Sequence, residues 1–367
     1  MKKTLIACLA MLAATAAFAQ APQPDAEEKL PPAKHPPDAK LERMIRDSLP
    51  VCTDMKLQYT DMVHKLPDNL TGLVVLTQSP RSSCAGQFLS VTSREGGFYF
   101  GVPWFLDDEK TGTLEQKLQH FTWEHMQENF TAVIDKTKTR DGLHKVTLLQ
   151  TTERGKLPLE GEIDDAGTVF FFGHFRPLTE DVKAGRLKAF EPFVANAPTT
   201  GAAKPAVTVI EFSDFECPSC QHASTYMKPI LDKYGDKVRY IRYDLPLVSN
   251  HPWAFAAAIA GRAVYRQKPD LFWEYKKQIY SNQDQLTAFT IDDFARNFAK
   301  DHELDLKKYD ADIASEAIHD EILKGIGVAF SNDIRATPSY VVNGSVVDAG
   351  PEGKSLEDYI ASLVGKS

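Results

Sequence analysis

The pattern of apolar and polar positions begins with a short apolar run and then a polar tether. The run extends from Leu5 to Phe18, follows Lys2 and Lys3, and ends at a small-x-small site. This arrangement is typical of a cleaved signal peptide over residues 1–19, because the run is too short to span a membrane. Residues 20–40 are proline-rich and contain no Phe, Trp or Tyr, so they predict a disordered tether.

Between the tether and a second polar linker at 196–205, amphipathic helical patterns alternate with short strand patterns. Residues 74–108 resemble residues 146–180 without a gap, and the identities include Phe98 with Phe170 and Gly101 with Gly173. A predicted amphipathic helix precedes each copy, near 41–49 and 114–130. The region 41–195 therefore predicts an α+β fold with two copies of a module of ~72 residues. Chance similarity between two β-rich stretches is the alternative.

The C-terminal region, 206–367, begins with a β-branched apolar strand at 207–212 that runs directly into a helix. A second strand at 238–243 precedes a helical block at 251–328, in which residues 290–293 resemble a capping box. A strand at 339–342, an Asn-Gly hairpin turn and a closing helix at 355–363 follow. This order predicts an α/β domain with a helical insertion.

Charge and cysteine content restrict the class of protein. The formal charge is −8, and it becomes −10 when Lys2 and Lys3 leave with the signal peptide. An acidic chain with scattered lysines argues against a nucleic-acid partner. The signal peptide also removes Cys8, which leaves Cys52, Cys84, Cys217 and Cys220. An even number of cysteines in an exported chain fits an oxidising compartment.

The strand-to-helix junction of the C-terminal region carries the candidate chemistry, Cys217-Pro218-Ser219-Cys220. Proline is tolerated at the first helical position, which places Cys217 at the helix N-terminus. Unpaired N–H groups and the helix dipole favour a thiolate there. We therefore expect Cys217 to be the exposed nucleophile and Cys220, one turn inward, to be the resolving thiol. A zinc site is disfavoured because the chain has a single C-x-x-C and no histidine at ligand spacing to it.

The other two cysteines, Cys52 and Cys84, lie in the first copy of the repeat. A structural disulfide between them is the preferred interpretation, since closing this loop would add about 3 to 4 kcal/mol. A second redox pair and a metal site are the alternatives. His120 and His125 form no H-E-x-x-H motif, and we expect them at the surface or at the edge of the core.

The C-terminal region resembles the DsbA-like family of thiol:disulfide oxidoreductases, which have a thioredoxin fold with an inserted helical domain. The resemblance covers nearly all of 206–367 and rests on VTVIEFSDFECPSC at 207–220, the passages within 243–254, FWEY at 272–275, NQD at 282–284 and ATPSYVVNG at 336–344. It implies that Thr337-Pro338 is a cis dipeptide beside the dithiol that offers backbone groups to a substrate.

The resemblance also assigns a role to Glu211, which precedes Cys217 by six residues. It matches an acidic residue beneath the active site that transfers protons to or from Cys220. A glutamate at a strand edge in water is the alternative. Ser219 stands where the best-known DsbA enzymes have histidine, which puts their strong oxidising power in doubt for this chain.

The N-terminal region is similar in its order of elements to the cystatin-like domain of the DsbC and DsbG isomerases, which dimerises and shapes a substrate cleft. This similarity implies that the protein forms a homodimer.

Together these features predict a periplasmic or otherwise extracytoplasmic soluble oxidase that introduces disulfides into unfolded or partly folded exported proteins without a cofactor. The family implies a quinone-linked membrane partner of the DsbB or VKOR type. One alternative is an isomerase or reductase kept reduced by a DsbD-like donor. A second alternative is a chaperone-like binding protein in which the dithiol is incidental.

Overall fold

The structure is a computed structural model that describes residues 31–52, 54–80, 84–93, 96–101, 103–106, 109 and 111–365. The predicted signal peptide and residues 20–30 of the predicted tether lie outside this range. Residues 31–38 have no regular secondary structure, whereas residues 39 and 40 already belong to a helix. None of the helices in the described ranges has the length and apolar content that a membrane crossing requires. The chain forms two compact units, the described parts of 1–48 with 53–181, and of 49–52 with 182–367.

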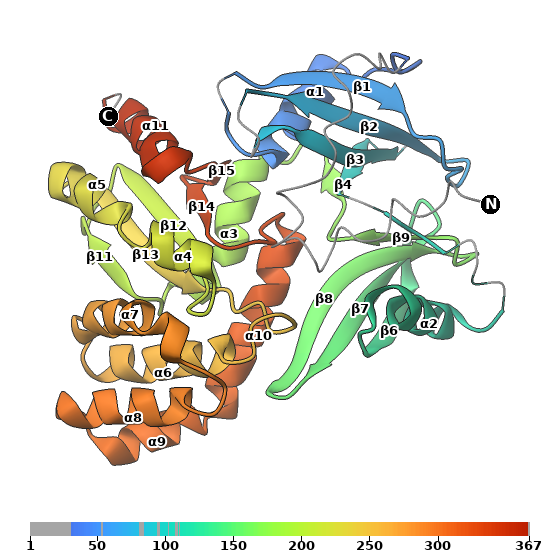
Figure 1. The fold of residues 1–367 in the computed structure, drawn as a ribbon. Helices are drawn as coiled ribbons and strands as arrows, with labels where there is room; N and C mark the ends of the chain where they lie inside the picture. The colour runs from blue at the N-terminus through green and yellow to red at the C-terminus, as the bar shows by residue number, and fades with distance from the viewer. Residues whose placement is uncertain are drawn as a thin grey trace. The chain divides into compact units, whose positions relative to one another are not determined.

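The first unit contains two helices and two five-stranded antiparallel sheets (Figure 1). Helix α1 (Ala39–Ser48) precedes a sheet with the strand order β1 (Lys56–Asp61), β2 (Leu70–Gln78), β3 (Gly86–Ser93), β4 (Gly97–Phe100) and β10 (Arg176–Pro177). The second sheet has the order β5 (Trp104–Phe105), β9 (Val169–Phe172), β8 (Gly155–Asp164), β7 (Leu143–Thr152) and β6 (Phe130–Arg140), and helix α2 (Leu114–Met126) lies in the chain between β5 and the other four strands. Helix α2 ends before the predicted residue 130, because Gln127 adopts a left-handed conformation.

In each sheet, one edge strand comes from the other half of the unit. Strand β10 follows β9 in the chain but pairs with β4, and β5 follows β4 but pairs with β9. Trp104 pairs with Phe170 and Arg176 pairs with Phe98. Residue numbers that differ by 72 relate the two pairings, because Trp104 corresponds to Arg176 and Phe98 corresponds to Phe170. The two copies of the repeat in the sequence have the same offset of ~72 residues.

The same offset relates residues in the shared core of the two sheets. Tyr99 stacks on its counterpart Phe171 with 4.7 Å between the ring centroids. Gly101 and Gly173, which precede the exchanged strands, both have positive φ angles, a conformation that favours glycine. We propose that the first unit is an internal duplication in which two α+β modules exchange their last strands.

The second unit is built on one central sheet with the strand order β11-β13-β12-β14-β15. Strand β12 (Val207–Ser213) is parallel to β13 (Val238–Asp244) and antiparallel to β14 (Ser339–Val342). Strands β11 (Thr199–Gly201) and β15 (Ser345–Val347) form the edges, and the predicted Asn343-Gly344 turn connects β14 to β15 with positive φ at both residues. Helices α4 (Pro218–Ala223) and α5 (Met227–Tyr234) connect β12 to β13, and α11 (Lys354–Val364) closes the chain.

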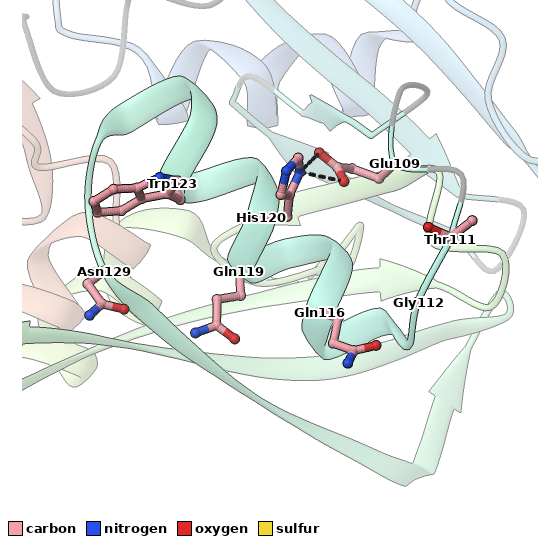
Figure 2. A pocket seen from close by; sticks show the side chains of 8 residues that line it. All are labelled: Glu109, Thr111, Gly112, Gln116, Gln119, His120, Trp123 and Asn129. Carbon is pink, nitrogen blue, oxygen red and sulfur yellow. Dashed lines mark hydrogen bonds and ion pairs between the residues drawn. The ribbon is translucent and has the colours of Figure 1, made fainter.

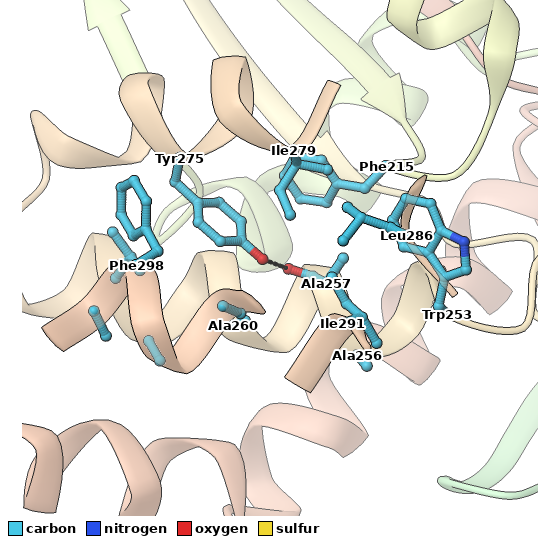
Figure 3. Close-up of a cluster of buried hydrophobic side chains, with 14 of the residues drawn as sticks. Phe215, Trp253, Ala256, Ala257, Ala260, Tyr275, Ile279, Leu286, Ile291 and Phe298 are labelled. Atoms are coloured by element: carbon cyan, nitrogen blue, oxygen red, sulfur yellow. Dashed lines mark hydrogen bonds between the residues drawn. The ribbon is translucent and has the colours of Figure 1, made fainter. Parts of the chain in front are cut away.

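Helices fill the connection between β13 and β14, as the sequence predicted. They are α6 (Ala254–Gln267), α7 (Leu271–Ser281), α8 (Ile291–Asp301), α9 (Leu306–Ile313) and α10 (Glu316–Ser331), with a short 3-10 turn η2 (Gln283–Gln285). The apolar faces of α6 to α9 form a buried cluster with Phe215, in which the Tyr275 hydroxyl donates to the carbonyl of Ala257 at 2.9 Å (Figure 3). A sheet of this order with a helical insertion before β14 is the predicted thioredoxin-like fold of the DsbA type.

The boundary between the units follows residue 181, not the predicted residue 195. Helix α3 (Val182–Val194) belongs to the second unit because Arg186, which is 1% exposed, donates to the carbonyls of Gly344 at 2.6 Å and Asn332 at 3.3 Å. The predicted linker at 196–205 contains β11, since residues 199–201 pair with β13. Its small and polar residues suit an edge strand, where few side chains need to be buried.

Two local predictions in the second unit also need correction. Thr290 does not cap helix α8, because its hydroxyl accepts a hydrogen bond from the backbone N–H of Thr287 at 3.0 Å. The sequence also predicts that Pro229 kinks or ends the helix that begins at Pro218, but it does not. The break occurs earlier, at residues 224–226, and Pro229 lies in the first turn of α5, where a missing N–H costs no helical hydrogen bond.

Candidate active site

The two cysteines of the C-x-x-C motif occupy the first turn of helix α4. Cys217 is the N-cap, Pro218 is the first helical residue, and the N–H of Cys220 donates to the carbonyl of Cys217 at 3.1 Å. Both cysteines are free thiols. Cys220 is fully buried as expected, but Cys217 is only 3% exposed and not the exposed thiol that the sequence suggested. Both pack in the apolar cluster of the helical insertion, whereas Pro218 and Ser219 are exposed.

The two thiols differ strongly in acidity. A hydrogen bond from Cys220 is the largest of the effects that lower the pKa of Cys217 to about 6, and they outweigh its burial. Burial, followed by the neighbouring charge of Cys217, raises the pKa of Cys220 well above its usual value. At neutral pH Cys217 is therefore a thiolate and Cys220 a thiol. This difference is consistent with the predicted roles of Cys217 as nucleophile and Cys220 as resolving thiol.

This difference predicts the pH dependence of alkylation. Below pH 6 Cys217 is protonated, so its rate with iodoacetamide should rise about tenfold per pH unit and level off above pH 6. Cys220 should remain unmodified in the folded protein through pH 8. Mass spectrometry of each cysteine after timed alkylation measures both rates. An inflection for Cys217 at pH 8 or above would contradict the assignment.

The dipeptide Thr337-Pro338 lies beside the dithiol and has a cis peptide bond, as the resemblance implied. It precedes β14, whose first residue pairs with Phe212 of β12, and the sheet thereby brings it next to Cys217. The Cys217 thiol donates to the Thr337 carbonyl at 3.4 Å. Among the described residues, the buried Thr337 hydroxyl has no hydrogen-bond partner.

Glu211 lies in the middle of β12 and is completely buried. Burial excludes the alternative of a strand-edge glutamate in water. The Tyr240 hydroxyl donates to Glu211 Oε2 at 2.6 Å, and Glu211 Oε1 has no hydrogen-bond partner in the part of the chain that the structure describes. Lys276 Nζ lies 4.0 Å from Glu211 Oε2 and donates to the Tyr240 hydroxyl at 3.0 Å. These three side chains form a buried polar cluster between the central sheet and helix α7.

Sequence reasoning missed Lys276, although its position carried a signal. Lys276 follows Phe272 by four residues and precedes Ile279 by three, so all three lie on one face of α7. That face is buried, and Lys276 is 6% exposed. Desolvation lowers the pKa of Lys276, although the charge of Glu211 opposes this effect. A lysine on the apolar face of a predicted helix is therefore a sign of a buried ionic partner.

Two acidic residues before the dithiol hold the loop at 245–254. Asp214 Oδ2 accepts hydrogen bonds from the N–H of Leu247 at 2.8 Å and from His251 Nδ1 at 2.7 Å. Glu216 Oε2 accepts from the N–H groups of Trp253 at 2.7 Å and Ala254 at 3.0 Å, where helix α6 begins. The loop is therefore fixed at both ends beside the active-site turn.

Gln283 of the NQD passage provides a further contact to that turn. Its amide Nε2 donates to the carbonyl of Phe215 at 2.8 Å and to the carbonyl of Cys217 at 3.1 Å. The helical insertion thereby holds the backbone that precedes α4. The sequence singled out this passage only as part of the family pattern, without a role for Gln283.

Apart from the C-x-x-C motif, Cys84 is buried, and Cys52 and Cys84 are both disulfide-bonded. Their pairing with each other stays a prediction.

A separate hollow lies along helix α2 in the first unit (Figure 2). Its lining includes the exposed Trp123 and His120, whose Nδ1 lies 2.8 Å from both carboxylate oxygens of Glu109. The expectation that His120 is a surface histidine is confirmed. The lining residues that the structure describes include no cysteine, and the free thiols Cys217 and Cys220 lie in the second unit.

Comparisons with known proteins agree with this location. Residues 194–362 match the thioredoxin family. The chain is 30% identical over 160 residues to a probable disulfide bond formation protein D of Bacillus cereus, which covers 42% of this chain and 72% of that protein. It is 25% identical over 175 residues to disulfide bond formation protein D of Bacillus subtilis, with 46% and 75% covered.

Other similar proteins match less than half of this chain. A Na(+)/H(+) antiporter NhaA 3 of Salinispora tropica is 32% identical over 144 residues, which are 39% of this chain and 21% of the antiporter, so the chain spans about a fifth of that relative. Among solved structures, oxidised BdbD from Bacillus subtilis has 21% sequence identity and a TM-score of 0.41, with 47% of this chain and 95% of that chain covered. The catalytic domain of Proteus mirabilis ScsC has 17% identity and a TM-score of 0.41, with 49% and 98% covered.

Proposed function

Because the C-terminal half of this chain belongs to the DsbA-like family of thioredoxin-fold thiol:disulfide oxidoreductases, we propose that the protein acts as an oxidase that introduces disulfides into exported proteins. The observation that carries this direction is the pKa of Cys217, lowered to about 6, beside the raised pKa of Cys220. A stabilised thiolate favours the reduced dithiol. A pair that is stabilised in its reduced form is a stronger oxidant in its disulfide form.

The reaction begins with the Cys217–Cys220 disulfide. A substrate thiolate attacks the sulfur of Cys217, the Cys217–Cys220 bond breaks, and Cys220 leaves as a thiolate that takes up a proton. A second substrate thiolate then attacks the substrate sulfur of the mixed disulfide, and Cys217 leaves as a thiolate. The substrate loses two electrons and gains a disulfide, while the enzyme gains the two electrons as a dithiol.

Several residues around the dithiol have proposed supporting roles in this reaction. Glu211 is the proposed proton donor to the departing Cys220, because water does not reach this buried thiol. The Thr337 backbone, positioned before β14 by Pro338, is the proposed docking edge for the substrate strand that presents its cysteine to Cys217. The exposed Pro218 and Ser219 shape the surface around that contact.

Partners and location follow from the same proposal. The substrates are unfolded or partly folded exported proteins, and a quinone-linked membrane oxidase of the DsbB or VKOR type accepts the electrons. The name of the Bacillus relatives, disulfide bond formation protein, supports this reading. The disulfide-bonded state of Cys52 and Cys84 fits an extracytoplasmic, oxidising compartment reached through the predicted signal peptide.

One observation favours a second candidate, an isomerase or reductase kept reduced by a DsbD-like donor. The helices α1 and α2 and the two antiparallel sheets of the first unit support this candidate, because the resemblance to the isomerases predicts an α+β region here. A chaperone-like role for this unit, with an incidental dithiol, would also use these modules.

The equilibrium potential of the Cys217–Cys220 pair tests the proposal. Equilibration with glutathione buffers, read by differential alkylation, should give a value near about −120 mV, as for strong oxidants, and thiol trapping in cells should find the pair oxidised. A potential near about −200 mV with a reduced pair in cells would favour the isomerase instead. An unchanged cellular phenotype in a Cys217→Ala strain would support the chaperone-like role.

A further inference from the structure

A buried negative charge lies beside the dithiol. Asp214 is 1% exposed, and its backbone N–H donates to the sulfur of Cys220 at 3.4 Å. Its carboxylate raises the pKa of Cys220 and opposes the effects that lower the pKa of Cys217. Taken alone, Asp214 therefore disfavours the Cys217 thiolate on which exchange depends.

His251 is the partner of that charge. Its Nδ1 lies 2.7 Å from Asp214 Oδ2, and its side chain is 13% exposed. Among the ion pairs that the structure gives for the described residues, Asp214 has this histidine as its cationic partner. The two loop contacts described above, Leu247 with Asp214 and Trp253 with Glu216, fix the backbone on both sides of His251.

Three negative groups face this imidazole: Asp214, Glu216 and the Cys217 thiolate. Burial is the largest single effect on His251 and disfavours its charge, but the hydrogen bond and charge of Asp214, followed by Cys217 and Glu216, raise its pKa above the usual value. The interaction between two titrating groups is reciprocal. If the Cys217 thiolate stabilises protonated His251, protonated His251 stabilises the thiolate by the same free energy.

We propose that protonated His251 neutralises Asp214 and thereby stabilises the Cys217 thiolate, so that it shifts the pair toward the reduced dithiol and makes its disulfide the stronger oxidant. His251 is thus a positioning residue that supplies a cation from the loop before α6, while Ser219 within the motif supplies none. The thiolate charge disappears when Cys217 enters a disulfide, and His251 therefore favours the reduced form selectively. This inference rests on the proposed thiol:disulfide exchange and adds a determinant of its direction.

The substitution His251→Asn separates charge from hydrogen bonding, since the asparagine Nδ2 can still donate to Asp214. We expect the acidity constant of Cys217 to be about tenfold lower in this variant than in the wild type. The ultraviolet absorbance of the thiolate, recorded against pH, measures this constant. The equilibrium constant for oxidising glutathione should fall about tenfold, which corresponds to about 30 mV toward a more reducing potential. His222→Asn is the matched control, because His222 is exposed on α4, near Cys220 in sequence; it should change neither value.

Two further measurements distinguish a charge effect from general loop support. In an Asp214→Asn background, His251 loses the partner that sustains its charge, so adding His251→Asn should no longer change the Cys217 acidity. In the wild-type protein, NMR titration should give a higher pKa for His251 in the dithiol form than in the disulfide form, a result that needs no variant to fold.

Equal His251 pKa values in the two redox forms, or an unchanged Cys217 acidity in folded His251→Asn, would overturn the inference. Failure of the oxidase proposal is a separate result, because it appears as a reducing potential of the wild-type pair while the acidity measurements remain informative.

Discussion

Replacement of Cys217 by alanine is expected to reduce thiol:disulfide exchange to the uncatalysed background. Cys220 cannot substitute as nucleophile because it is fully buried and its pKa is raised well above the usual value. Even a thiol with an ordinary pKa near 8.5 would be about thirtyfold less ionised at pH 7 than one with a pKa of about 6. Burial adds a further loss. Oxidation of a dithiol peptide in glutathione buffer measures the effect.

Replacement of Cys220 should have a different result, which serves as the control. Cys220→Ala retains the nucleophile but cannot release a bound substrate, so mixed disulfides through Cys217 should accumulate on non-reducing gels. Its Cys217 should be less acidic, because the hydrogen bond from Cys220 is the largest cause of the low pKa. Cys220→Ser restores a donor and should recover part of that acidity. Adducts with Cys217→Ala but none with Cys220→Ala would reverse the assigned roles.

Local sequence signals predicted most of the catalytic unit. The β-branched run of β12, the proline after Cys217 and the Asn343-Gly344 turn each act over a few residues, and each is found where expected. Two predictions failed where distant partners decide the outcome. The buried Arg186 binds α3 to the second unit, and residues 199–201 become a strand because β13 offers a free edge.

The exchange of strands in the first unit could not be predicted from the sequence, for a related reason. Strands β5 and β10 have only two residues each, so they show no periodicity. The repeat of ~72 residues indicated similar modules but not which module each short strand would join. Pairing across the modules is a property of the assembled unit.

The residues of the candidate site also differ in whether the sequence predicts them. Cys217 and Cys220 could be predicted from spacing, and Thr337-Pro338 and Glu211 from the family pattern. The partners of Lys276 and His251 could not, because each of these residues contacts a carboxylate that is distant in sequence and is held there by the tertiary fold. The missed residues are the charged partners of buried carboxylates.

Replacement of Lys276 by methionine should destabilise the folded protein by about 3–5 kcal/mol. Methionine has a similar length and fills the same apolar space, but it removes the cation that is paired with the fully buried Glu211. Removing one partner of a buried ion pair costs this much because the remaining charge is uncompensated. Urea unfolding followed by circular dichroism measures the change in the free energy of unfolding.

Two controls identify the charge as the cause. Lys277→Met changes the neighbouring lysine, whose side chain is 74% exposed, and should alter stability by less than about 0.5 kcal/mol. The double variant Lys276→Met with Glu211→Gln removes both charges and should recover most of the loss, since glutamine can still accept the hydrogen bond from Tyr240. If the double variant is as unstable as Lys276→Met alone, lost packing of the lysine chain is the cause and the charge pair contributes little. Replacing a buried ion pair by neutral groups can leave the fold intact. If the double variant recovers its stability but Cys220 is protonated slowly, the pair also serves catalysis, because Glu211→Gln removes the proton donor.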